Sequence, residues 1–144
     1  MHKVQRSVLV PYSREQMFRL VEDVERYPEF MPWCGGAQVL HRDDHGMEAS
    51  ITISIAGIRQ TFTTRNTHDF PGVITFELVK GPFSHLRGTW EFMSLAADAC
   101  KVVYTMEYQF ASRALEAVVG PVFNRIATSF IDSFTQRAQV LYGD

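Results

Sequence analysis

The sequence predicts an α+β fold, in which a curved antiparallel sheet of about seven strands surrounds a long C-terminal helix and a short helical segment follows the first strand. Short stretches of alternating apolar and polar residues, joined by connections of hairpin length, are typical of an antiparallel meander. From Ser112 the apolar residues recur every three or four positions, which is typical of a helix with one apolar face. A sheet covered by one helix leaves space at its ends, so an apolar cavity is expected there.

The first strand is predicted over residues 3–10 and ends at Pro11. Ser13 and Gln16 form the sequence pattern of a capping box, which satisfies free backbone N–H groups at the start of a helix. The apolar residues that follow have helical spacing, and a short helix is therefore expected over residues 13–24. One face of the first strand combines apolar residues with an arginine: Val4, Arg6, Val8 and Val10.

The next segment, residues 27–36, is apolar but irregular. Pro28 and Pro32 exclude a regular helix and interrupt a strand ladder. Exposing the Tyr, Phe, Met and Trp side chains of this segment to water would be unfavourable. We therefore expect a packed loop that closes one end of the cavity.

Six further strands are expected before the helix. Their predicted positions are residues 37–42, 51–55, 59–67, 74–78, 86–92 and 102–110, with turns at 43–46, 56–57, 71–72, 81–82 and 96–99. Gly88 marks either a bulge or a point of close approach. The final helix, of ~29 residues, would be ~44 Å long. Gly120 and Pro121 are expected to kink it or to start its main part.

Composition limits the classes of protein to consider. A length of 144 residues fits one domain over residues 1–144, and 46% hydrophobic with 21% charged residues is a globular profile. The net charge of −2 lacks the basic excess of a protein that binds nucleic acid through phosphates, so no DNA partner is expected. Cys34 and Cys100 form no C-x-x-C pair, and two reduced, buried thiols are expected.

The sequence also bears on location. The N-terminus lacks the apolar core of a signal peptide, and no stretch approaches the ~20 apolar residues that span a bilayer. We therefore expect a cytoplasmic protein, at most peripheral at the inner membrane. Eleven Phe, five Tyr and two Trp could fill a core or line a pocket, and composition leaves both interpretations open.

Four motifs carry a resemblance. Residues 23–34 read D-V-E-R-Y-P-E-F-M-P-W-C, and residues 81–86 fit G-P-F-x-x-L. Two further sets are Trp90, Phe92 and Cys100, and Phe134, Arg137, Ala138, Tyr142 and Gly143. In these motifs the chain resembles the START-like, or helix-grip, superfamily of polyketide cyclases and dehydrases. The resemblance is to its branch of coenzyme Q-binding proteins and RatA ribosome-association toxins.

The resemblance implies a helix-grip fold with a hydrophobic tunnel. It implies non-catalytic binding of ubiquinone or a similar isoprenoid lipid in support of respiratory electron transport, with no cofactor required. The alternative is a RatA-type toxin that binds the large ribosomal subunit and blocks subunit association. The motifs do not choose between these two interpretations. A cyclase- or aromatase-like enzyme is a third interpretation.

Candidate ligand-binding residues follow from the motifs and the apolar helix face. The apolar candidates are Tyr27, Phe30, Pro32, Trp33, Phe83, Leu86, Trp90, Phe123, Ile126 and Phe130. Core packing alone is an equal alternative for the aromatic residues outside the helix: Tyr27, Phe30, Trp33, Phe83 and Trp90. It is the stronger alternative for the inward-facing helix residues Phe123, Ile126 and Phe130. His85 and Arg87, expected near the cavity mouth, could donate hydrogen bonds to quinone oxygens. The alternative for Arg87 is a pair with a surface carboxylate.

Catalysis has little support in the sequence. Four of the five histidines, among them His68 before Pro71, lie at ends or turns, where a solvated side chain is usual. The histidines and aspartates of residues 41–45 share one short turn, so no metal site is expected. An enzyme would need a buried His, Asp or Glu in the cavity with a perturbed pKa, and a wholly apolar cavity would exclude one.

Overall fold

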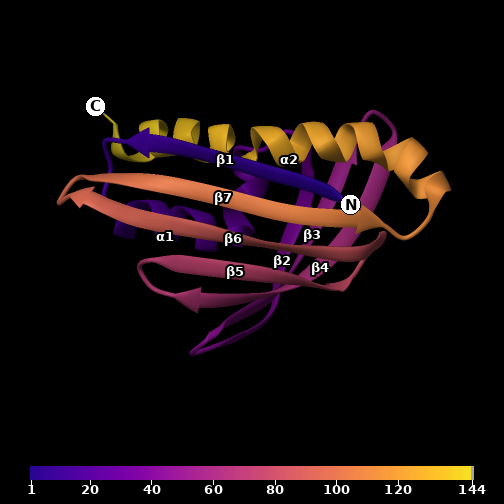
Figure 1. Ribbon diagram of the computed structural model, residues 1–144, viewed down its shortest axis with the longest axis horizontal. Coiled ribbons are helices and arrows are strands. Elements are labelled where there is room, and N and C mark those ends of the chain that lie inside the picture. The colour runs from indigo at the N-terminus through magenta and orange to yellow at the C-terminus, as the bar shows by residue number, and fades with distance from the viewer. Residues whose placement is uncertain (144) are drawn as a thin grey trace.

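The computed structural model describes residues 1–143 and contains one seven-stranded antiparallel sheet with a long helix packed against it (Figure 1). The elements are β1 (His2–Val10), α1 (Arg14–Glu22), the 3-10 helix η1 (Val24–Glu29), β2 (Cys34–Asp43), β3 (Gly46–Ile55), β4 (Ile58–Asp69), β5 (Val73–Lys80), β6 (Phe83–Ala96), β7 (Ala99–Phe110) and α2 (Arg113–Tyr142). The strand order is β1-β7-β6-β5-β4-β3-β2. The predicted fold class is confirmed. The predicted meander holds for β2 to β7, whereas β1 pairs with β7 at the edge of the sheet opposite β2.

The sheet curves around α2. Figure 1 shows β1 and β7 running along the helix, whereas β2, β3 and β4 cross the view steeply below it. The apolar stripe of α2 faces the concave side of the sheet and is buried there. Its buried members are Val119, Phe123, Ile126, Ala127, Ile131, Phe134 and Ala138.

An arginine on the inner face of β1 has a structural role. Val4 and Val10 are buried on this face, as the alternation predicts. Arg6 lies between them at the edge of the sheet, where its guanidinium donates a hydrogen bond to the carbonyl of Thr128 on α2 at 2.7 Å. The charged side chain therefore ties the edge strand to the helix.

The capping box at the start of α1 is confirmed. The Ser13 hydroxyl accepts a hydrogen bond from the backbone N–H of Gln16 at 3.1 Å, and Ser13 N–H donates to Gln16 Oε1 at 3.0 Å. The expected irregular loop is more ordered than predicted, because η1 accommodates Pro28. The strand expected from residue 37 begins at Cys34, since a register shift between Cys34 and Gly36 extends its pairing with β3.

The long helix keeps Pro121 inside it, so of the two expectations for Gly120 and Pro121 the kink holds. The helix begins at Arg113, and the hydroxyl of Ser112 accepts a hydrogen bond from the N–H of Leu115 at 3.1 Å. Figure 1 shows the first turns of α2 inclined to the rest. Proline has no N–H for the helical ladder, which explains a bend here.

Gly88 is a point of close approach. It lies in register with Phe76 on β5 and Met106 on β7, which rules out the alternative of a bulge at this position. A Cβ atom at Gly88 would lie 2.3 Å from Phe76 Cζ and 2.4 Å from the carbonyl oxygen of Thr105. Only glycine lets the Phe76 ring cover the strand here.

Gly88→Ala is therefore expected to destabilise the protein by roughly 1–3 kcal/mol, because the added methyl group overlaps both a ring and the backbone. Urea unfolding followed by circular dichroism measures the change. Gly36→Ala is the matched control, since the nearest atom to its added Cβ is Thr52 Oγ1 at 4.0 Å. Equal losses in the two variants would contradict the role assigned to Gly88.

Candidate functional site

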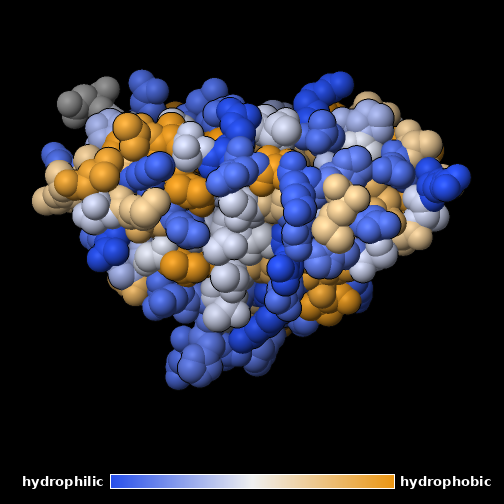
Figure 2. Space-filling view, viewed as in Figure 1, coloured by the Kyte–Doolittle hydropathy of each residue, from blue (hydrophilic) through white to orange (hydrophobic). Residues whose placement is uncertain are grey.

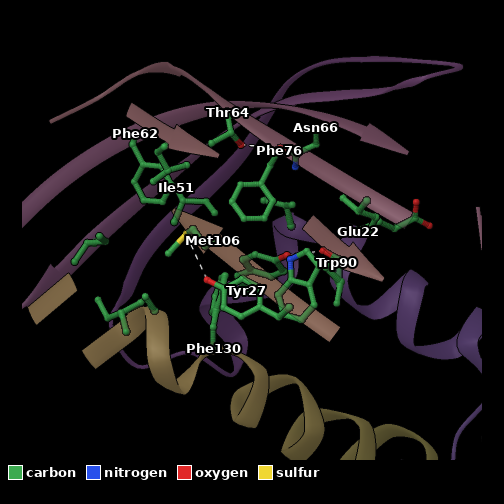
Figure 3. Close-up of a pocket in the computed structure, with 18 of the residues that line it drawn as sticks. Glu22, Tyr27, Ile51, Phe62, Thr64, Asn66, Phe76, Trp90, Met106 and Phe130 are labelled. Atoms are coloured by element: carbon green, nitrogen blue, oxygen red, sulfur yellow. Dashed lines mark hydrogen bonds between the residues drawn. The ribbon is translucent and has the colours of Figure 1, made fainter. Parts of the chain in front are cut away.

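An apolar cavity lies between the concave face of the sheet and α2 (Figure 3). Its volume is about 70 Å³, measured as the space open to the centres of water molecules. The wall is formed by α1, η1, strands β3 to β7 and α2. Seven of the predicted ligand-binding residues line it: Tyr27, Trp33, Leu86, Trp90, Phe123, Ile126 and Phe130.

Aromatic contacts hold one side of this wall. The ring of Phe130 lies 5.7 Å from Trp33, 6.0 Å from Trp90 and 6.2 Å from Tyr27, measured between centroids. The hydroxyl of Tyr27 donates to the carbonyl of Val21, and burial raises the pKa of Tyr27 well above its usual range. These rings are consequently fixed by packing and, at Tyr27, by a satisfied hydrogen bond.

Three predicted apolar residues lie outside the cavity wall. Phe30 packs from outside against Phe134 at 5.7 Å, and Pro32 is exposed on the surface. Phe83 is buried behind the wall, where its ring lies 4.8 Å from Phe123. Their expected place in the wall is corrected, because the 27–33 segment and the start of β6 present only some of their side chains to the cavity.

The expected position of His85 and Arg87 near the cavity mouth is wrong. Leu86 and Trp90 face the cavity, so His85 and Arg87, at the alternate positions of β6, face away from it. A register shift between Phe83 and His85 lets Phe83 be buried as well. His85 and Arg87 both bind Glu107 Oε1, at 3.1 Å from His85 Nε2 and 2.8 Å from Arg87 Nε. The alternative expectation, a surface carboxylate as partner of Arg87, is what the structure shows.

His85 and Arg87 change the pKa of the Glu107 carboxylate. The hydrogen bond from His85, followed by the positive charge of Arg87, lowers the pKa of Glu107. The group is a surface ion-pair cluster on the convex face of the sheet.

One end of the cavity is polar, which the sequence pattern was not expected to produce. Glu22, Thr64, Asn66 and His68 line this end. Figure 3 shows Thr64 and Asn66 beside each other, and the Thr64 hydroxyl donates to Asn66 Oδ1 at 2.7 Å. His68 Nδ1 lies 3.5 Å from Glu22 Oε2. His68 Nε2 is buried and has no hydrogen-bond partner within residues 1–143.

Burial dominates the electrostatics of this pair. Desolvation lowers the pKa of His68, assisted by the positive charge of Arg42, and desolvation raises the pKa of Glu22. Both shifts run opposite to those of a strong ion pair, so we infer a neutral imidazole beside the carboxylate. The His68 side chain is only 16% exposed, and the expectation of a solvated histidine before the turn is wrong here.

Strand parity could have revealed these residues. Thr64, Asn66 and His68 alternate in phase with Phe62, whose ring also lines the cavity. The burial of His68 follows from its place in this alternation and not from its closeness to the turn. A wholly apolar wall would have excluded an enzyme. The wall contains two titratable side chains, Glu22 and His68, so an enzyme is not excluded on this ground.

Residues 1–143 contain no group of three or more His, Cys, Asp or Glu side chains arranged to hold a metal ion. No helix in this part of the chain is long and apolar enough to cross a membrane. Cys34 and Cys100 are free and buried, as expected.

The chain is similar over its whole length to known proteins. It is 48% identical over 145 residues to the ribosome association toxin RatA of Vibrio cholerae, and the match covers 100% of both chains. It is 23% identical over 146 residues to a mitochondrial coenzyme Q-binding protein homologue of Xenopus laevis, covering 95% of this chain and 58% of that protein.

Solved structures share the architecture. An 18 kDa protein from Caulobacter crescentus is 33% identical, with a TM-score of 0.76 and 100% of both chains covered. A START superfamily protein from Mycobacterium smegmatis is 19% identical, with a TM-score of 0.79 and coverage of 98% and 99%. A Streptomyces aromatase/cyclase is 20% identical, with a TM-score of 0.79 and coverage of 98% and 96%.

The similarities to the Mycobacterium and Streptomyces proteins, at 19% and 20% identity, concern the fold alone. Residues 10–135 match the family described as polyketide cyclase / dehydrase and lipid transport. This match spans most of the chain, and the chain therefore belongs to the polyketide cyclase / dehydrase and lipid transport family.

Proposed function

We propose that this protein is a RatA-type toxin, which binds the large ribosomal subunit and blocks subunit association without catalysing a reaction. The observation that carries the proposal is the end-to-end 48% identity to a ribosome association toxin, against 23% to a coenzyme Q-binding homologue. The proposal places the protein in the cytoplasm.

The convex face of the sheet supports this proposal. One row of side chains crosses β5, β6, β7 and β1 in register and consists of Thr75, Thr89, Thr105 and Gln5. The neighbouring row alternates in charge and consists of Glu77, Arg87, Glu107 and Lys3. Figure 2 shows a pale band beside a blue band on the face of the sheet turned to the viewer.

These rows border one broad hollow on the sheet surface. Their hydroxyl, amide and charged groups can form direct and water-mediated hydrogen bonds with a large polar partner. The alternating charges leave no local excess of positive charge, so attraction to phosphates does not dominate this surface. We therefore place the ribosomal contact on this convex face, with Thr89 near its middle.

The test uses purified bacterial ribosomal subunits at a magnesium concentration that supports joining. The protein is expected to increase the fraction of separated subunits in a sucrose gradient. Thr89→Arg should weaken this effect roughly tenfold or more, because a long charged side chain obstructs the centre of the contact. Thr61→Arg is the matched control, since Thr61 is an exposed residue on β4, outside the two rows.

Unchanged gradients with the wild-type protein would rule out the proposed function. Equal effects of the wild-type protein, Thr89→Arg and Thr61→Arg would leave the function and rule out the convex face as its site.

The cavity favours a second candidate function, the binding of ubiquinone or a similar isoprenoid lipid, with peripheral contact at the inner membrane. Its aromatic and aliphatic wall suits an apolar molecule. The space of about 70 Å³ is well below the roughly 300–1,000 Å³ of ordinary ligand pockets. Binding therefore requires wall side chains such as Phe62 and Phe76, which are only partly buried, to move.

Organic extraction followed by mass spectrometry tests this candidate. A bound lipid is expected from the wild-type protein, and Ala127→Val should reduce its amount several-fold by filling the cavity from α2. Ala117→Val makes the same change at an exposed position of α2 and should retain the lipid. No extractable lipid together with no measurable quinone affinity would rule out the candidate.

A further inference from the structure

We infer that the cavity end bordered by Glu22 and His68 binds the polar head group of an amphipathic ligand, and that this head group carries a hydroxyl. The inference rests on the ligand-binding candidate and narrows it. Oxidised ubiquinone has only carbonyl and ether oxygens, so the ligand is its reduced, hydroxyl-bearing quinol form or another isoprenoid lipid with a hydroxyl group. It is independent of the ribosomal proposal, which uses the opposite face of the sheet.

The distribution of polar groups points to this end of the cavity. Thr64, Asn66 and His68 occupy alternate positions of β4, and Glu22 approaches from α1. Figure 3 shows Thr64, Asn66 and Glu22 on the side of the cavity away from the ring of Phe130. Much of the remaining wall is aromatic or aliphatic. A ligand with one polar end matches such a wall in a single orientation.

The donor and acceptor nitrogens of the His68 imidazole determine which group the ligand must supply. A neutral imidazole has one donor nitrogen and one acceptor nitrogen. The Glu22 carboxylate, 3.5 Å from Nδ1, favours the tautomer that carries its proton there. Nε2 is then an acceptor, and it is buried without a partner within residues 1–143. An O–H group on the ligand would satisfy it.

Asn66 supplies the complementary group. Its Oδ1 already accepts the Thr64 hydroxyl at 2.7 Å, which leaves the amide N–H groups to donate. A hydroxyl both donates and accepts, so it can use His68 Nε2 and Asn66 together. A carbonyl or an ether oxygen only accepts and would leave Nε2 without a hydrogen bond.

The same end of the cavity lies next to the outside. Glu22 and His68 also border a second hollow, on the surface, together with Phe18, Arg42 and Phe70. The Glu22–His68 pair therefore separates the cavity from this surface hollow. A ligand that enters between α1 and β4 would place its apolar body inside and its hydroxyl at the pair.

Two small probes isolate the hydroxyl. 4-Propylphenol and 4-propylanisole have the same apolar body, but only the phenol can donate a hydrogen bond. Both are titrated into the full-length protein and followed by two-dimensional NMR. The phenol is expected to bind about three- to tenfold more tightly, the range of one net hydrogen bond.

His68→Phe keeps an aromatic ring and removes the acceptor, so the preference for the phenol should fall to about one. His85→Phe is the matched control: it alters a different His–Glu contact, on the convex face, and should retain the preference. The nitrogen-15 shift of His68 Nε2 in the wild-type protein provides a second measurement, and it should move with the phenol and not with the ether.

Each outcome decides the inference. Binding of neither probe would overturn it together with the ligand-binding candidate. Equal binding of both, as expected if a water molecule already serves Nε2, would overturn the head-group assignment alone. A preference that persists in His68→Phe, or a Nε2 shift that does not move with the phenol, would place the hydroxyl elsewhere and overturn it too.

Discussion

The aromatic contact between α2 and the 27–33 segment is the constraint on which the rest of the structure depends. The ring of Phe134 lies 5.3 Å from Tyr27 and 5.1 Å from Trp90, which joins η1, β6 and α2 at one point. Each such pair contributes about 0.5–1.5 kcal/mol beyond the burial of its area. One helical turn earlier, Phe130 faces the cavity. The contact that holds the helix thus also sets the position of the cavity wall.

Polar contacts outside the core fix the same arrangement. The guanidinium of Arg137 lies 5.1 Å from the centre of the Phe30 ring and binds Glu29 at 2.9 Å. Arg6 ties β1 to the middle of α2. Arg6 acts at the middle of α2 and Arg137 near its C-terminal end, so together these contacts oppose sliding of the helix along the sheet and separation from the aromatic segment. This explains why Phe30, predicted as a ligand contact, acts from outside the cavity.

Alternation and turn residues are enough to predict the antiparallel sheet and the long helix, because each strand buries one face. They do not predict that β1 pairs with β7. Local departures from the alternation were not predicted. The register shift beside His85 lets Phe83 and Leu86 both be buried. His85 and Arg87 follow the regular alternation of β6 and face outward, which their closeness to the Gly81-Pro82-Phe83 motif does not indicate. His68 was judged by its distance from a turn, whereas its parity with Phe62 sets its burial. The predicted site residues were wrong where the face toward which a side chain points depends on strand alternation or on a register shift.

Strand parity also explains how one sheet can serve both proposed functions. On β6, Leu86 and Trp90 face the cavity, whereas Arg87 and Thr89 face the convex surface. Substitutions on one set leave the other set's side chains in place. The exception is Gly88, where the Phe76 ring covers the strand and leaves no room for a side chain. A ligand that displaces the Phe76 ring would lie against the backbone of β6 at Gly88. At this position that backbone separates the cavity from the convex face.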